Sequence, residues 1–329
     1  MPGEPSSQEA CGHPRVVCLG ETMVMFAPPG QERIELSTRF QSYLGGAESN
    51  VAIGLERMGV HAGWIGKLAA NALGHRLVNE MRSHGVDTCA VVWTGQGRVG
   101  TFFFEFAVPP RPQVTIYDRA GSAATTLTTA ELNWDYIERA EWLHLTGITP
   151  ALSDTCRTTV LEVARRAKTA GLKVCLDVNY RKLMWTREAA RTTLRELLPF
   201  VDMLIATEAD ARMLTGRQLE PKDALRALRD EGELSAVVIT LRERGSAGYD
   251  GGSFFTAPGH EAVVVNRLGA GDAFAAGLLY GMIGGSLPDG LRYANAMAAL
   301  KLTIPENIPL VNKAEVERLV AGDSIDLVR

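Results

Sequence analysis

The sequence predicts an α/β fold, in which a largely parallel sheet is covered by helices on both faces and a small β-sheet is inserted as a lid. Short apolar runs alternate along the chain with longer helical patterns, which is typical of right-handed βαβ units. Residues 91–119 break this alternation, because they contain strand-like runs with no helix between them. With 329 residues, the chain fits one large domain with an appendage better than several small domains.

The strands predicted for the main sheet are short and rich in β-branched or apolar residues. They lie at 16–20, 62–68, 142–148, 173–179, 201–207 and 236–240. Helical patterns fill the connections at 47–58, 71–84, 153–170, 187–198 and 221–231. Ligands of such sheets bind at the carboxyl ends of the strands, so we expect the functional site there.

The lid is predicted from two segments, about 33–43 and 91–119, and it would cover a pocket. Residues 1–14 are polar and rich in proline and glycine, and they lack the apolar core of a signal peptide. We therefore expect a disordered tail over 1–14 and the folded domain over 15–329.

Composition excludes several classes of partner. A net charge of −4 leaves no basic surface for nucleic acid or anionic lipid. The longest apolar stretch, 273–283, is too short to span a bilayer, so we expect no membrane association. The five cysteines are odd in number and scattered without a CxxC pair. This pattern predicts reduced thiols in the cytoplasm rather than a disulfide framework or a zinc site.

Several common catalytic motifs are absent or misplaced. GQGRVG at 95–100 matches GxGxxG, but TFFFEF follows it, so a hairpin fits better than a dinucleotide-binding turn. The first strand also lacks such a turn, which argues against a nicotinamide dehydrogenase. The sequence contains no GxxxxGK[ST], no HRD…DFG set and no HExxH, and so lacks the marks of P-loop proteins, protein kinases and zinc proteases.

The strongest motif is LGAGDAFAAGLLYGM at 268–282, a turn of small residues that opens a buried helix. Gly269, Ala270 and Gly271 allow a ligand to approach their N–H groups closely, at a helix end that favours anions. Asp272 would lie beside that anion site and could accept a proton from an attacking hydroxyl. From spacing alone, an aspartate that merely caps the first turn is equally possible.

Two weaker patterns accompany it. GGAESNVAIGLERMG at 45–59 is a second glycine-rich turn entering a helix, and by itself it fits a plain strand-to-helix connection, although the Asn50 amide could reach a ligand hydroxyl. Arg119 and Arg181 each follow an apolar strand. Each could be an ordinary solvated charge, or the two could clamp a carboxylate bidentately.

Taken together, these segments resemble the ribokinase-like (PfkB) carbohydrate kinases, and most closely the 2-keto-3-deoxygluconate kinase branch. GGAESNVAIGLERMG and LGAGDAFAAGLLYG resemble the two signatures of the family, and RPQVTIYDRAGSA, HLTGITPAL, DVNYRKLMW and ALKLTIP are similar to stretches of sugar-acid kinases. The resemblance implies a Rossmann-like three-layer sandwich with a β-lid. It also implies ATP and Mg²⁺, and transfer of the γ-phosphoryl group to a hydroxyl of a small sugar or sugar acid.

The resemblance also implies roles for individual residues. Asp272 would be the general base, with Gly269, Ala270 and Gly271 as the anion hole. The sugar site would be lined by Gly45, Gly46, Asn50, Tyr117, Arg119, Ile148 and Arg181. The nucleotide would lie near Thr207, Thr240, Arg242, Gly245 and Asn295. Asp210 would support the metal indirectly, and the assembly would be a homo-oligomer.

Some positions depart from the family pattern. Asn266 stands where relatives usually have an aspartate, which removes a charge that would favour a monovalent cation. Thr207 and Asp210 occupy the ends of the usual NxxE motif, Ala70 replaces a frequent aspartate, and Arg242 replaces the usual glycine of the nucleotide loop.

The leading hypothesis is a 2-keto-3-deoxygluconate kinase that makes the 6-phosphate. A kinase for fructose, ribose or another keto-deoxy acid is the nearest alternative, and a non-catalytic sugar-binding relative is a further one. The changes at Thr207 and Asn266 favour the non-catalytic relative, whereas the intact Asp272 argues against it.

Overall fold

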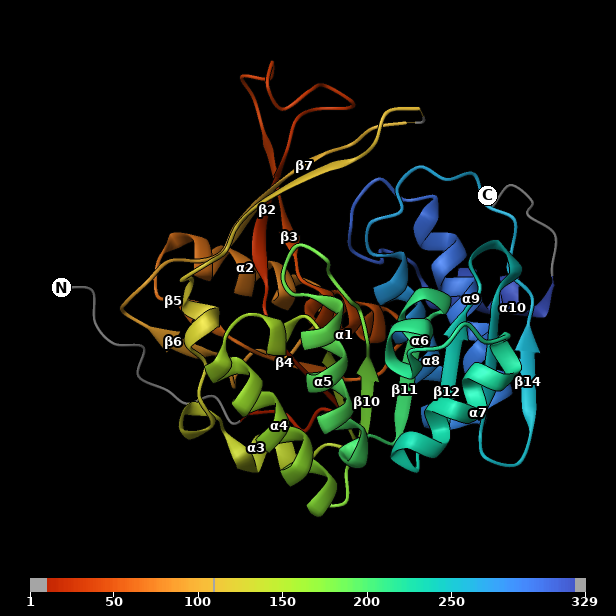
Figure 1. Cartoon of the computed structure of the whole chain (residues 1–329). Helices are drawn as coiled ribbons and strands as arrows, with labels where there is room; N and C mark the ends of the chain where they lie inside the picture. The colour runs from red at the N-terminus through yellow and green to blue at the C-terminus, as the bar shows by residue number, and fades with distance from the viewer. Residues whose placement is uncertain (1–10, 109, 323–329) are drawn as a thin grey trace.

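A central sheet lies between two layers of helices in the computed structural model, which describes residues 11–108 and 110–322 (Figure 1). The sheet has the order β14-β13-β12-β11-β10-β9-β1-β4. Its strands are β1 (Val16–Leu19), β4 (Ala62–Ile65), β9 (Trp142–Thr146), β10 (Lys173–Asp177), β11 (Met203–Thr207), β12 (Ala236–Thr240), β13 (Ser246–Tyr249) and β14 (Phe254–Ala257). The pairings from β4 to β12 are parallel, whereas β13 pairs antiparallel with both β12 and the edge strand β14. The predicted α/β class is confirmed.

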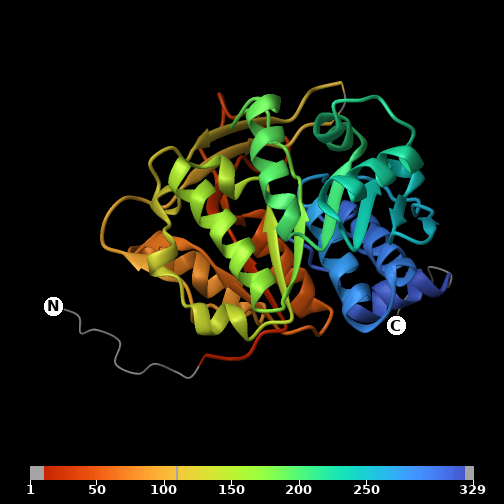
Figure 2. The same ribbon diagram turned by 60° about the horizontal axis from the view of Figure 1, so that its bottom comes forward.

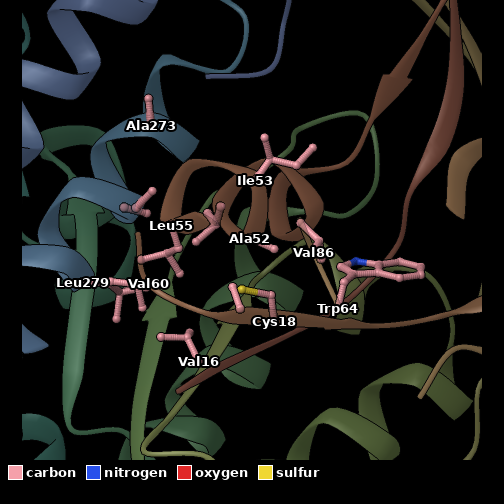
Figure 3. Packing of buried hydrophobic residues seen from close by; sticks show 14 of the residues in the cluster. Val16, Cys18, Ala52, Ile53, Leu55, Val60, Trp64, Val86, Ala273 and Leu279 are labelled. Carbon is pink, nitrogen blue, oxygen red and sulfur yellow. The ribbon is translucent and has the colours of Figure 1, made fainter. Parts of the chain in front are cut away.

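Each face of the sheet has its own hydrophobic core, because alternate residues of a strand point to opposite sides. In β1, Val16 and Cys18 belong to one core, whereas Val17 and Leu19 belong to the other. The first core is covered by α1 (Ala47–Arg57), α2 (Ala72–Ser83), α8 (Ala270–Gly284), α9 (Leu287–Leu302) and α10 (Lys313–Ala321). Figure 3 shows Val16 and Cys18 facing Ala52 and Leu55 of α1.

The second core is covered by helices from the middle of the chain, which lie together in Figure 2, apart from the blue C-terminal helices. They are α3 (Trp134–Glu138), α4 (Asp154–Thr169), α5 (Arg187–Leu197), α6 (Glu208–Thr215) and α7 (Pro221–Gly232). Several of these helices begin with a side-chain cap. At the start of α4, Ser153 Oγ accepts a hydrogen bond of 3.0 Å from the Cys156 N–H. The predicted helices at 71–84, 153–170 and 187–198 begin at such a cap, whereas α1 and α7 begin without one.

The lid is a four-stranded sheet that projects from one end of the molecule, at the top of Figure 1. Its strands, in the order β3-β2-β7-β8, are β2 (Met23–Ala27), β3 (Gln41–Gly45), β7 (Thr101–Glu105) and β8 (Val114–Asp118). The predicted lid boundaries need correction. Residues 33–40 contain no strand, and β2 supplies the strand that pairs with β3.

The predicted strand at 62–68 is also two strands. The chain leaves the main sheet after β4 at Gly66, where a Cβ atom would lie 2.4 Å from the Gly20 carbonyl oxygen. It continues as β5 (Lys67–Ala69), which pairs with β6 (Val92–Thr94) in a separate two-stranded sheet. Residues 91–94 therefore do not belong to the lid.

The prediction for the cysteines is wrong in part. Cys11 and Cys89 form a disulfide, while Cys18, Cys156 and Cys175 are free and buried. Sequence spacing could not reveal a pair separated by 78 residues. The predicted tail lies largely outside the described residues, which begin at Cys11. Within the described ranges, no helix is long and apolar enough to cross a bilayer.

Candidate active site

The start of α8 is built to receive an anion. Gly269 precedes the helix with φ of 86°, and a Cβ atom there would lie 1.9 Å from the Asn307 carbonyl oxygen, so only glycine fits. No side chain of the described residues caps the helix. A Cβ atom added to Gly271 would meet nothing within 4 Å, so space remains for a ligand beside the first N–H groups. These groups and the helix dipole together favour a phosphoryl group.

Asp272 lies in the first turn of α8 and is 8% exposed. Its Oδ2 accepts a hydrogen bond of 2.7 Å from Nδ2 of Asn50, a residue of α1. Burial raises the pKa of Asp272 to about 6, against the opposing effects of Asn50, Arg181 and Lys301. The side chain does not cap the helix, so the structure does not support the alternative that Asp272 is only a capping residue. A buried carboxylate with such a pKa is suited to accept a proton near neutral pH.

The residues predicted for the sugar site lie together in one pocket between the lid and the end of the main sheet. Gly45 ends lid strand β3, Gly46 directly precedes α1, Tyr117 belongs to lid strand β8, and Ile148 to the turn after β9. Every residue predicted for the sugar site lines this pocket together with Asp272, namely Gly45, Gly46, Asn50, Tyr117, Arg119, Ile148 and Arg181. Segments far apart in the sequence therefore converge where the resemblance implied.

Arg119 is already engaged by the protein. Its Nη2 donates to Oε2 of Glu21 in a buried ion pair, and Ser122 Oγ donates to the other oxygen of Glu21 at 3.2 Å. The guanidinium also lies 5.2 Å from the centre of the Tyr117 ring. Burial raises the pKa of Glu21, although Arg119 opposes this effect. The guanidinium is therefore held in one orientation, and part of its charge is balanced before a ligand binds.

Arg181 differs from Arg119 in its surroundings. It is exposed, and no carboxylate of the described residues forms an ion pair with it. Its charge lowers the pKa values of Asp177, Asp210 and Asp272, so these acids share its neighbourhood. Arg181 is consequently the more available cation of the predicted pair.

The residues predicted for the nucleotide lie at the same edge of the sheet but not in the sugar pocket. Thr207 and Thr240 are paired partners at the carboxyl ends of β11 and β12. Gly245 follows with φ of 92°, and a Cβ atom there would lie 2.1 Å from the Ala257 carbonyl oxygen. Asn295 donates to that same oxygen at 2.9 Å, while Arg242 adopts φ of 57° in the intervening turn. Asn295 and Gly245 thus shape one loop.

Thr207 and Asp210 form a capping box at the start of α6. Thr207 Oγ1 donates to Asp210 Oδ2 at 2.7 Å and accepts from the Asp210 N–H at 3.1 Å. Among the described residues, no three His, Cys, Asp or Glu side chains could hold a metal ion by themselves. Burial and the charges of Asp210 and Asp272 raise the pKa of Asp177 to about 8. A divalent cation carried by phosphates would relieve this crowding of carboxylates, so the residues fit a magnesium site completed by ligand and water.

Sequence reasoning missed four residues of this region. Glu21 and Asn307 line the pocket, Asp177 ends β10, and Lys301 is buried behind the anion hole. The sequence held some signal, because Asp177 and Lys301 stand inside DVNYRKLMW and ALKLTIP, and Glu21 directly follows the predicted strand at 16–20. Their roles depend on contacts between distant segments, which the motifs do not encode.

Nearly the whole chain is similar to known carbohydrate kinases. Residues 13–311 match the pfkB family carbohydrate kinases. The chain is 37% identical to the 2-dehydro-3-deoxygalactonokinase of Haloferax volcanii, over 95% of this chain and 99% of that protein. It is 34% identical to the 2-dehydro-3-deoxygluconokinase of Bacillus subtilis, over 88% of this chain and 90% of that protein.

The structure is similar to that of the 2-dehydro-3-deoxygluconokinase of Thermotoga maritima, with a TM-score of 0.89 and 32% sequence identity. This similarity covers 94% of the chain and all of the compared one. The chain belongs to the pfkB family of carbohydrate kinases and is an ATP-dependent sugar kinase.

Proposed function

We propose that this kinase phosphorylates a 2-keto-3-deoxy sugar acid, and that its main substrate is 2-keto-3-deoxygluconate, converted to the 6-phosphate. The observation that carries the proposal is the convergence of Asp272, Asn50, Arg119 and Arg181 on one pocket. A neutral sugar does not need two cations in its site, whereas the carboxylate of a sugar acid does. The names of the relatives from Bacillus subtilis and Thermotoga maritima support the same class of substrate.

In this proposal, Asp272 accepts the proton of the attacking hydroxyl as that oxygen bonds to the γ-phosphorus of ATP. The bond between the γ-phosphorus and the oxygen that bridges to the β-phosphate breaks at the same time, and ADP leaves. Asn50 holds the carboxylate through its 2.7 Å hydrogen bond and so fixes the oxygen that faces the substrate. The N–H groups of Gly269, Ala270 and Gly271 stabilise the charge that develops on the transferring group. Asp177 and Asp210 would hold a magnesium ion through water, and the ion would supply positive charge to balance the phosphates.

The acid group of the substrate is assigned to the two arginines. Arg181 supplies an exposed guanidinium, while Arg119 contributes N–H groups that its pairing with Glu21 leaves available. Burial of Arg119 strengthens any hydrogen bond that it makes to a ligand carboxylate. The lid residues Phe102 and Tyr117 then cover the apolar side of the sugar chain.

The C4 epimer, 2-keto-3-deoxygalactonate, is a second candidate substrate. It is favoured by the 37% identity to the Haloferax volcanii protein, whose name specifies that sugar acid. The epimers carry the same carboxylate and the same terminal hydroxyl, so the arginines and Asp272 would serve both. Discrimination would depend on contacts to one hydroxyl group in mid-chain.

The test is a substrate panel with purified protein, ATP and Mg²⁺, in which ADP release is measured. The panel contains both epimeric acids, fructose and ribose, and phosphorus NMR identifies the hydroxyl that is phosphorylated. We expect the highest kcat/KM with a 2-keto-3-deoxy acid and a 6-phosphate product. A higher kcat/KM with fructose or ribose would overturn the assignment to sugar acids.

We further propose that the protein works in the cytoplasm as a homo-oligomer. A cytoplasmic ATP supply supports the location. The lid exposes Phe40, Val114 and Ile116, which are 38%, 39% and 50% accessible, and these apolar residues support contact between copies. Light scattering after size-exclusion chromatography gives the mass of the assembly directly, and a monomer would contradict this part of the proposal.

A further inference from the structure

Lys301 is a buried lysine with an unusual set of partners. It stands in the last turn of α9 with no exposed surface. Its Nζ donates to the main-chain carbonyl oxygens of Asn266 and Ile304, both at 3.3 Å. In the described part of the chain, no carboxylate lies within 4.0 Å of this ammonium group. A buried charge held only by carbonyl oxygens is costly, so its position requires an explanation.

The ammonium group lies directly behind the anion hole. A Cβ atom built on Gly269 would be 3.3 Å from Cε of Lys301, so the end of the lysine side chain packs against the residue that precedes α8. The charges of Lys301 and Asp272 also influence each other's pKa values. Lys301 therefore reaches both the phosphoryl-binding turn and the proposed base from inside the protein.

The same contacts tie two chain segments together. Asn266 donates from Nδ2 to the Pro305 carbonyl at 2.7 Å and accepts from the Leu268 N–H at 2.9 Å. Lys301 joins this network through the carbonyl groups of Asn266 and Ile304. The turn that leads into Gly269 is thus fixed to the end of α9, whose dipole favours a cation at this place.

The ammonium group remains charged at neutral pH. Burial lowers the pKa of Lys301 to about 8, while the negative charges of Asp272 and Glu306 oppose this effect. The neutral carbonyl groups that surround Nζ are the partners that a bound monovalent cation would also take. At neutral pH the side chain therefore supplies a positive charge among carbonyl oxygens of the kind that bind small cations.

We propose that Lys301 is an internal cation that fixes the anion-hole turn and strengthens its positive potential toward the γ-phosphoryl group of ATP. The inference rests on the proposed kinase function and extends it to a positioning residue, because Lys301 touches neither substrate. It predicts that the wild-type enzyme responds little to potassium, since the place of the cation is already filled. The absence of a carboxylate at Asn266 has the same consequence.

Two substitutions separate this role from simple packing. Lys301→Met keeps the aliphatic length without charge, and Lys301→Ala leaves a space lined by the two carbonyl groups. We expect kcat/KM for ATP to fall by roughly 10–100-fold in both variants, which is the effect of one lost charge at short range. Ammonium or potassium at constant ionic strength, with choline as the reference ion, should restore part of the activity of Lys301→Ala and none of that of Lys301→Met. Lys313→Met, at a half-exposed lysine of α10, is the matched control.

A binding measurement gives a second readout. Calorimetry should show a larger loss of affinity for ATP than for ADP in Lys301→Met, because the anion hole meets the γ-phosphate. If both variants keep wild-type kcat/KM and the same ratio of ATP to ADP affinity, the inference is wrong. If they are impaired but Lys301→Ala is insensitive to ammonium and potassium, Lys301 is a packing residue and the inference again fails. Absence of kinase activity in the wild type with every sugar would instead overturn the proposed function, and the affinity ratio would still test Lys301.

Discussion

Asp272 is the residue on which the chemistry depends most directly. Its carboxylate is buried, oriented by Asn50 and placed directly beside the anion hole, in the first turn of α8. Asp272→Asn removes the proton acceptor while leaving the main-chain N–H groups in place. We expect kcat to fall by about 10²–10⁴-fold, the usual contribution of a positioned base, with ATP affinity nearly unchanged. Steady-state kinetics and calorimetry measure the two quantities, and wild-type turnover by the folded variant would exclude the role.

The pH dependence follows from the same side chain. Burial raises the pKa of Asp272 from 3.8 to about 6, and only the deprotonated carboxylate can accept a proton. Activity should therefore be present above pH 6 and decline as the pH falls through 6, toward a tenfold loss per pH unit. The profile of kcat/KM for the sugar measures this pKa in the free enzyme. A profile that stays flat down to pH 4.5 would show that another group controls proton transfer.

The two arginines are expected to differ when each is replaced. Arg181→Ala removes an exposed cation without leaving a buried partner, so kcat/KM for the sugar acid should fall by roughly 10–150-fold, the effect of one charge-assisted hydrogen bond. The loss with fructose should be much smaller. Lys182→Ala, at the neighbouring exposed cation, is the control. An unchanged ratio between the two substrates would mean that Arg181 does not recognise the carboxylate.

Arg119→Ala tests thermal stability as well as activity, because Glu21 would lose its buried partner. An unpaired buried charge costs about 3–5 kcal/mol, so this variant should lose thermal stability as well as activity. Sequence patterns indicated Arg119 as a ligand-binding residue but not its dependence on Glu21, which lies 98 residues away. Only the fold brings those two side chains together.

At the scale of elements, the sequence predicts helices and buried strands well and the lid less well. The strands β9, β10, β11 and β12 carry continuous apolar runs, because helices cover both faces of the sheet. Lid strand β8 alternates between exposed and partly buried residues. Strand β2 follows β1 after a short turn, so the sequence does not show that the two strands belong to different sheets. The antiparallel strands β13 and β14 are also not predicted from the sequence. Pairing partners, rather than local propensity, decide these elements.

In the candidate site, the sequence alone identifies some residues, whereas others can be identified only from contacts between distant segments. The turn before α8 is recognisable because Gly269 must adopt a positive φ and sit against the Asn307 carbonyl. The buried Lys301 behind it gives only a weak sequence signal, since a lysine near the end of a helix is usually solvated. Its burial results from the meeting of the α9 end with the segment around Asn266.

At the scale of the whole molecule, the Cys11–Cys89 disulfide links the start of the described chain to the segment after α2. The bridge closes a loop across a separation of 78 residues and restricts the unfolded chain, so it should stabilise the fold by about 2–4 kcal/mol. Cys11→Ser should lower the Tm by several degrees under oxidising conditions. The pocket residues lie elsewhere, so kcat should be nearly unchanged.

Reductant provides the internal control for this prediction. Cys89 is exposed, so dithiothreitol can reach the bridge, and the reduced wild type should then melt at the same temperature as Cys11→Ser. The free cysteines 18, 156 and 175 are buried, and burial raises the pKa of each thiol, which limits their exchange with the bridge. Calorimetry with and without reductant measures the shift. Equal Tm values for the oxidised wild type and Cys11→Ser would show that the bridge adds no stability, and the fold would then depend on its two hydrophobic cores alone.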